Sequence, residues 1–380
     1  MDFSWTPEQE QYRKEVIRFG RERLGKAVRE LDRTEEFDRQ GWRECANFGI
    51  QGLPIPEQFG GSAADVLTTV CGLEALGYSC RDNGLLFSLS AHIWACELPI
   101  LNFGSEAQKA NYLPRLASGE WIGALAMAEP EAGSDAFNIK TTAVSKGDSY
   151  LITGSKTFVT NGPVADLLLV VASLDPSKGW QGLTAFLIEK QTPGLTVRPL
   201  EKMGLRSSPI GEIFFDDCKV AACSRLGEEG GGAAIFTHAM EWERAFILAP
   251  AVGTMERVLE RCLDYAKERR QFGKSIGKFQ LISSKLVDMR LRLETARNLL
   301  YRVAWLKASG KSVFAEAAMT KLHISESWVQ SCLDAVQLFG GYGYLSDLEV
   351  ERELRDALGS KIFSGTSEIQ RNLIAQLMGL

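Results

Sequence analysis

Four short segments contain residues whose types and spacing could do chemistry. In chain order they are MAEPEAGSD (127–135), SKTFVTNG (155–162), ERRQFGKSIGKFQ (268–280) and QLFGGYGY (337–344). Gly133 and Ser134 can bring backbone N–H groups and a hydroxyl close to a phosphate, although a tight loop before a strand has the same letters. Arg269 could pair with a diphosphate, or it could be a solvated basic residue at a helix end.

The second and fourth segments allow similar double interpretations. Phe158 and Thr160 come at the end of a strand-like run, where the aromatic ring could pack on a planar ligand and the hydroxyl could hydrogen-bond it. Plain alternation of core residues explains them equally well. Gly340 and Gly341, after Gln337, would let the C-terminus of a helix approach a ligand, but Gly-Gly-Tyr-Gly is also a good helix stop.

Two further stretches carry a carboxylate and a hydroxyl. The segment HAMEWERAFILAPAVG (238–253) contains Glu243 followed by Arg244, and such a pair ordinarily lies on the exposed face of an amphipathic helix. The segment FSGTSEIQR (363–371) predicts a turn that opens a last short helix. Its second residue, Ser364, becomes informative only when the rest of the chain is considered.

Composition restricts the class of protein. The chain has 380 residues, of which 45% are hydrophobic and 24% charged, and a formal net charge of −5, so it lacks the basic footprint of a nucleic-acid binder. The N-terminus has no basic segment followed by an apolar run, and no window approaches about 18 continuous apolar residues. We therefore expect a cytoplasmic protein without a nucleic-acid or membrane partner.

Cysteine and histidine usage argues against disulfides and metals. The eight cysteines are scattered without a CxxC pair, which predicts buried reduced thiols, and the three histidines are isolated from any second ligand at metal spacing. No metal site is expected.

Helical patterns dominate the first part of the chain, for which we predict an N-terminal helical domain over residues 1–120. Thr6 with Pro7 and Gln9 predicts an N-cap, and the helix that follows can run to about Arg33. Helical spacing recurs around residues 41–50, and again after a Pro/Gly loop at residues 54–62.

Strand patterns follow and then give way to helices again. Residues 121–226 predict a compact antiparallel β domain, with a turn at Gly147 and Asp148. Residues 227–380 predict a helix bundle, in which one buried face contains Met255 and another Met289, and two further helices follow. The predicted fold class is α+β, with a helical domain, a middle β domain and a C-terminal four-helix bundle.

The order and spacing of the four segments on this α-β-α chain resemble the acyl-CoA dehydrogenase family of flavoproteins, and the resemblance covers essentially the whole chain. It implies an FAD-dependent oxidoreductase acting on CH–CH bonds. It also implies that the last two segments reach the FAD of a neighbouring subunit, and hence a homotetramer. By the resemblance, the residues that bind FAD are Met127, Ala128, Gly133, Ser134, Phe158, Thr160, Arg269, Gln271, Phe272, Gln280, Gln337, Gly340, Gly341, Thr366 and Glu368.

Three positions depart from the family pattern. Ala128 stands where a Thr or Ser usually touches the flavin pyrimidine edge, and Phe158 stands where a Trp usually covers the ring. Ser364 occupies the place of the glutamate that removes the substrate α-proton in most members, and an unassisted hydroxyl is a far weaker base than a carboxylate.

The resemblance also supplies a replacement base. Glu243 lies where a minority of members, including the isovaleryl enzymes, carry the catalytic glutamate on an adjacent helix. Arg244 would orient or tune this carboxylate, and Pro250 would kink the helix nearby, whereas Glu241 points to a different face. The Ser364 backbone N–H would bind the thioester carbonyl, an oxyanion-hole role that tolerates serine.

Serine in SGTS together with glutamate in WER, the FFDDC strand and the RLGEEG loop resembles prolyl carrier-protein dehydrogenases and oxidases of secondary metabolite biosynthesis. The implied reaction is α,β-dehydrogenation of an L-prolyl thioester on the phosphopantetheine of a peptidyl or acyl carrier protein, with electrons passing to oxygen or to an electron-transfer flavoprotein. The alternatives are another carrier-bound acyl group, a short branched-chain acyl-CoA dehydrogenase, or a flavin-binding protein without catalysis. More remote relatives oxidise nitroalkanes or add oxygen.

Overall fold

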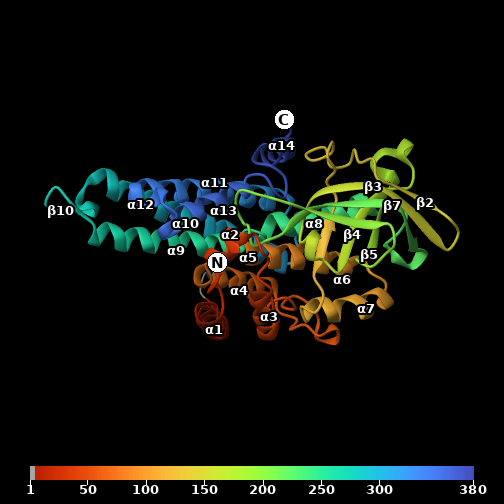
Figure 1. Cartoon of the computed structure of the whole chain (residues 1–380), viewed down its shortest axis with the longest axis horizontal. Helices are drawn as coiled ribbons and strands as arrows, with labels where there is room; N and C mark the ends of the chain where they lie inside the picture. The colour runs from red at the N-terminus through yellow and green to blue at the C-terminus, as the bar shows by residue number, and fades with distance from the viewer. Residues whose placement is uncertain (1–4) are drawn as a thin grey trace.

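The computed structural model of the protein describes residues 5–380 and confirms the α+β class. Figure 1 shows the strands of the large sheet gathered at one end of the long axis and the long helices α9, α10 and α11 running to the other end. Most of the shorter N-terminal helices, coloured red to orange, lie below these two parts, and α2 and α5 lie between the two parts.

The N-terminal part begins with helix α1 (Pro7–Arg23), which is capped as predicted. The Thr6 hydroxyl accepts from the Gln9 backbone N–H, and the Gln9 side chain accepts from the Thr6 N–H, both at 3.2 Å. The other helices of this part are α2 (Val28–Thr34), α3 (Arg39–Phe48), α4 (Val66–Ser79), α5 (Asn83–Ala91), α6 (Leu98–Phe103) and α7 (Glu106–Ala117).

The prediction that the first helix continues to about Arg33 is wrong. The helix ends at Arg23, and the chain turns at Gly25, whose φ of 67° is left-handed and therefore favours glycine. A separate helix, α2, then begins at Val28.

One apolar segment is long enough to cross a membrane. Residues Asn83–Phe103 form 21 continuous helical residues, including a π-helical turn over His92–Glu97, and contain an 18-residue window of mean hydropathy 1.4. Within the fold, 89% of this window is buried, as expected for the core helix of a folded domain. The segment is not a continuous apolar run, because Ser88, His92 and Glu97 interrupt it.

The sheet has the strand order β6-β7-β3-β2-β4-β5-β8, with β1 beside β4. Its strands are β1 (Gly123–Ala126), β2 (Thr142–Ser145), β3 (Ser149–Thr160), β4 (Leu167–Ser173), β5 (Leu183–Glu189), β6 (Leu195–Leu200), β7 (Ile210–Ala221) and β8 (Arg225–Leu226). Most neighbours are antiparallel as predicted, but β1 and β2 pair with β4 in parallel, so the sheet is mixed. Parallel pairing requires a long crossover, and β2 and β3 together supply one between β1 and β4.

Strand β4 is buried on both faces, which explains its continuous apolar sequence. Leu167, Leu169 and Val171 belong to the main core shared with the helices. Leu168 and Val170 point to the other face, into a smaller core that includes residues of β3 and β7. The sheet is thus held against the helices by every second residue of its central strand.

The C-terminal part contains the helices α8 (Gly232–Phe246), α9 (Ala249–Glu268), α10 (Gln280–Ala308), α11 (Phe314–Phe339), α12 (Gly341–Tyr344), α13 (Val350–Gly359) and α14 (Ser367–Leu377). Met255 and Met289 lie on buried faces, as their spacing predicts. Between α9 and α10 the chain forms a small hairpin of β9 (Arg270–Gln271) and β10 (Lys274–Ser275). Helix α13 is additional to the two helices predicted for this end of the chain.

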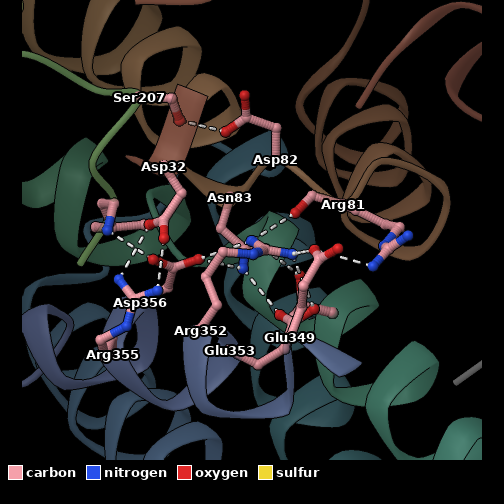
Figure 2. A network of polar contacts seen from close by, with 12 residues as sticks. Asp32, Arg81, Asp82, Asn83, Ser207, Glu349, Arg352, Glu353, Arg355 and Asp356 are labelled. Atoms are coloured by element: carbon pink, nitrogen blue, oxygen red, sulfur yellow. Dashed lines mark hydrogen bonds and ion pairs between the residues drawn. The ribbon is translucent and has the colours of Figure 1, made fainter. Parts of the chain in front are cut away.

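Helix α13 supplies a buried polar network that ties the three parts together (Figure 2). The Asn83 amide of α5 donates to Glu353 and to Asp356, both at 2.9 Å. Asp356 also accepts from the Leu205 N–H in the β6–β7 loop, at 2.6 Å, and from Arg352 at 3.2 Å. Ser207 of the same loop donates to Asp82, so every part contributes side chains to one junction.

All eight cysteines are free thiols, but Cys223 is exposed, so the prediction of buried thiols is wrong at that position. Cys223 follows the end of β7 in a short surface turn, where neither sheet nor helix covers it. Within residues 5–380 the structure contains no cluster of three or more metal-ligating side chains.

Candidate active site

Glu243 lies in the last turns of α8 and is only 8% exposed, so it is not part of a charged surface patch. The Ser364 hydroxyl donates to Glu243 Oε1 across 121 residues of sequence. Burial raises the pKa of Glu243, while the Ser364 hydrogen bond and the charge of Arg244 oppose that shift. Ser364 therefore contacts the carboxylate directly, a contact that sequence reasoning missed.

Arg244 holds the turn around Ser364 rather than the carboxylate. Its Nε donates to the Ser364 carbonyl at 3.3 Å, and its guanidinium lies 5.8 Å from the centre of the Phe314 ring. Its effect on Glu243 is that of a nearby positive charge. Glu241 faces elsewhere, accepting from Lys307 at 2.6 Å and from the Val313 N–H at 3.3 Å.

Two buried side chains that the sequence analysis did not select complete this turn. Lys321 donates to the Gly365 carbonyl at 2.7 Å, and Gln370 donates to the carbonyls of Ser364 and Gly365 at 3.0 and 2.9 Å. A signal for Lys321 existed, because it shares the three-four spacing of Ala317 and Ile324, which marks the buried face of α11. Thr366 accepts from the Ile369 N–H and so begins α14, as predicted, while Glu368 is exposed in its first turn.

An apolar floor lies behind the turn. The rings of Phe87 and Phe363 are 4.4 Å apart, and a cavity of about 20 Å³ adjoins them. The cavity is also lined by Ile247 and Leu248, the two residues that separate α8 from α9. Pro250 is the second residue of α9, so the helices are interrupted close to the proline, where a kink was predicted.

The segments at residues 127–135 and 155–162 lie side by side. The Thr157 N–H donates to the Ala128 carbonyl at 2.8 Å, and the buried Lys156 donates to the Met127 carbonyl at 3.0 Å. Phe158 is 66% exposed with a left-handed φ of 55°, at the end of β3 where Thr160 is the last residue. Strained backbone at an exposed aromatic residue is typical of a binding surface.

Two more residues that sequence reasoning missed support this surface. Lys156 also donates to Glu129 at 2.8 Å, and Glu129 accepts from the N–H groups of Lys140 and Thr141. This buried pair closes the base of the loop containing Gly133 and Ser134, both of which are exposed. The Asn161 amide donates to the Ser88 carbonyl of α5 at 3.0 Å, which connects the end of β3 to the helices.

The third and fourth segments form a separate open groove of about 790 Å³. It is lined by Arg269, Gln271, Gly340 and Gly341 together with tyrosines of α9 and α12. Of the other predicted residues, Phe272 is 94% exposed at the hairpin tip, and Gln280 and Gln337 are exposed at the ends of their helices. Figure 1 places the hairpin and α12 at the end of the molecule opposite the sheet, so one chain does not bring all predicted residues into one site.

Comparison with known proteins gives the family. The family models for the N-terminal, middle and C-terminal domains of acyl-CoA dehydrogenase match residues 6–120, 124–218 and 230–379. The L-prolyl-[peptidyl-carrier protein] dehydrogenase of Pseudomonas fluorescens is 42% identical, with 100% of both chains covered. The mitochondrial isovaleryl-CoA dehydrogenase of Pongo abelii is 40% identical over 98% of this chain and 88% of its own.

Solved structures agree with this assignment. The prolyl acyl carrier protein oxidase AnaB is 53% identical, with a TM-score of 0.98 over 99% of this chain and 100% of its own. The complex of PigA with FAD and proline is 42% identical, with a TM-score of 0.97 over 100% of both chains. The chain therefore belongs to the acyl-CoA dehydrogenase family of FAD-dependent oxidoreductases, which act on CH–CH bonds.

Proposed function

We propose that this enzyme catalyses the FAD-dependent α,β-dehydrogenation of an L-prolyl thioester carried by a peptidyl or acyl carrier protein. The observation that carries the proposal is the buried carboxylate of Glu243, hydrogen-bonded to Ser364 where the usual base is absent. Full-length similarity to a prolyl carrier-protein dehydrogenase and a prolyl carrier-protein oxidase supports the choice of substrate.

The residues present fit FAD. A Cβ built on Gly133, Gly340 or Gly341 meets no atom within 4 Å, so a ligand can approach the backbone at all three positions. Phe158 offers an exposed aromatic face for the flavin ring, and Arg269 in the groove offers a cation for the diphosphate. Ala128 has no hydroxyl for the pyrimidine edge, so its backbone N–H would make that contact.

The residues around Glu243 suit the removal of a proton next to a thioester. Glu243 accepts the α-proton on a carboxylate oxygen as the Cα–H bond breaks, and burial brings the pKa of this group closer to neutral pH, where a base is most effective. The Ser364 N–H donates to the thioester carbonyl and stabilises the developing enolate. FAD, when bound, would supply at N5 the acceptor for the β-hydrogen as hydride. The electron pair of the Cα–H bond would then form the Cα–Cβ double bond.

The position of the groove supports a homotetramer. Arg269 and Gly340 lie at the end of the bundle opposite the sheet, where they would bind the FAD of a neighbouring subunit. The reduced flavin would be reoxidised by oxygen or by an electron-transfer flavoprotein.

An anaerobic mixing experiment tests the substrate. The purified yellow protein is mixed with a prolyl-loaded carrier protein and, separately, with isovaleryl-CoA, while the absorbance of oxidised flavin is recorded. We expect bleaching by the prolyl carrier alone. Bleaching by the CoA ester alone would establish the second candidate, a short branched-chain acyl-CoA dehydrogenase, which the similarity to the isovaleryl enzyme favours.

Replacing Arg269 by methionine is expected to weaken FAD binding about tenfold or more, because a charge-assisted bond to a phosphate is worth about 1.5–3 kcal/mol. The measurement is the FAD dissociation constant of the apoprotein, by titration of flavin fluorescence. The matched control is Arg270→Met in the adjacent hairpin, because the Arg270 side chain donates to its own turn at Gly273. Equal dissociation constants for the two variants would contradict the assignment of Arg269.

A further inference from the structure

Lys321 is a buried cation close to the proposed base, and it has no role in the proton removal described above. It lies in the first half of α11 and is 0% exposed. Its ammonium donates to the Gly365 carbonyl at 2.7 Å and lies 5.8 Å from the centre of the Phe363 ring. Among residues 5–380 it forms no ion pair, although an isolated buried ammonium is costly. The fold must therefore gain something from a lysine here.

One gain is the conformation of the turn. Ser364 and Gly365 have φ values of 55° and 86°, and a left-handed conformation is unfavourable for a serine. Such a residue persists only where its surroundings hold it. The Ser364 carbonyl accepts from Arg244 and Gln370, and the Gly365 carbonyl accepts from Gln370 and Lys321. Two successive carbonyls are thus fixed by three buried or partly buried donors.

The other gain is electrostatic. Charged groups act on Lys321 from each side: Glu243 and Arg244 from α8, Glu326 from its own helix and Glu368 from α14. Glu326 is already engaged, accepting from Lys361 at 2.8 Å and from Ser367 at 2.7 Å. The positive charge of Lys321 in turn favours the ionised form of Glu243.

We propose that Lys321 is a positioning residue of the dehydrogenation, locking the Ser364–Gly365 turn and stabilising the carboxylate of Glu243 before it accepts the proton. This inference rests on the function proposed above for Glu243. Burial, together with the charge of Arg244, lowers the pKa of Lys321 to about 7, so the support that it gives the carboxylate varies with pH near neutrality.

Two variants separate the two effects. Lys321→Gln keeps a donor for the Gly365 carbonyl but removes the charge, and Lys321→Met removes both at similar length. Lys307→Met is the matched control, since Lys307 pairs with Glu241 on the same helix as Glu243 but does not contact the turn. All are prepared as holoenzymes, and FAD content and thermal midpoint confirm folding.

The first readout is anaerobic flavin reduction by the prolyl carrier as a function of pH. The rate requires ionised Glu243, so it falls on the acid side as pH drops through the pKa of this group. Removing the Lys321 charge raises that pKa, and we expect the acid limb to move up by about one pH unit in both variants. Lys321→Met should also raise the KM for the thioester, whereas Lys321→Gln should not.

The second readout needs no turnover. In protein labelled with carbon-13 at glutamate carboxyls, the resonance absent from Glu243→Gln is titrated in each variant. We expect this resonance to titrate at higher pH in both Lys321 variants. In Lys307→Met its titration should be the same as in the wild type. An unmoved resonance overturns the inference even if activity is low. If the resonance shifts but no thioester bleaches the flavin, the proposed function fails while the electrostatic link between Lys321 and Glu243 stands.

Discussion

Replacing Glu243 by glutamine is expected to slow flavin reduction by the prolyl thioester by about a thousandfold or more. The amide has nearly the same size as the carboxylate and can still accept the Ser364 hydrogen bond, but it cannot take up the α-proton. In the described part of the chain, Glu243 is the one carboxylate that is hydrogen-bonded to Ser364 or Gly365, so we expect no second base to replace it.

The measurement is rapid anaerobic mixing of each holoenzyme with saturating prolyl carrier, with the decay of oxidised-flavin absorbance as the signal. Glu241→Gln is the matched control, because Glu241 lies on the same helix but binds Lys307 and the Val313 N–H. FAD content should be unchanged in both variants. Wild-type rates in Glu243→Gln would remove Glu243 from the mechanism, and a wild type that no thioester reduces would favour a flavin-binding protein without catalysis.

Replacing Arg352 by methionine is expected to lower the free energy of unfolding by about 3 kcal/mol or more, because breaking a buried ion pair leaves an uncompensated charge. Arg352 is 3% exposed and donates to Asp356 at 3.2 Å, to Glu349 at 3.1 Å and to the Arg81 carbonyl at 2.9 Å (Figure 2). Asp356 is itself 2% exposed and would lose its cation within the junction of the three parts.

Urea unfolding followed by circular dichroism, at one protein concentration and with excess FAD, measures this loss. Arg33→Met is the control, since Arg33 pairs with Glu30 on an exposed helix surface, where an ion pair contributes about 0–1 kcal/mol. Equal unfolding midpoints for the two variants would show that the Figure 2 network does not hold the parts together.

Local patterns in the sequence determined most elements of this protein. The Thr6 cap and the alternation of β3 each depend on neighbours a few residues away, so they can be recognised without a structure. Glu243 was predicted from the family pattern instead. A serine stands at position 364 where most members have the catalytic glutamate, and Glu243 stands where a minority of members carry it. The identity of the proposed base was therefore available from the sequence alone.

The tertiary structure decided what surrounds that base. The contact between Ser364 and Glu243 spans 121 residues of sequence. The contact between Lys321 and Gly365 joins α11 to the turn that precedes α14. Likewise, the parallel pairing of β1 with β4 and the placement of the Arg269 groove far from the sheet follow from packing. Hydrogen bonds and charges act through space, so a buried lysine or a relocated carboxylate acquires its partners and its pKa only when distant helices pack together.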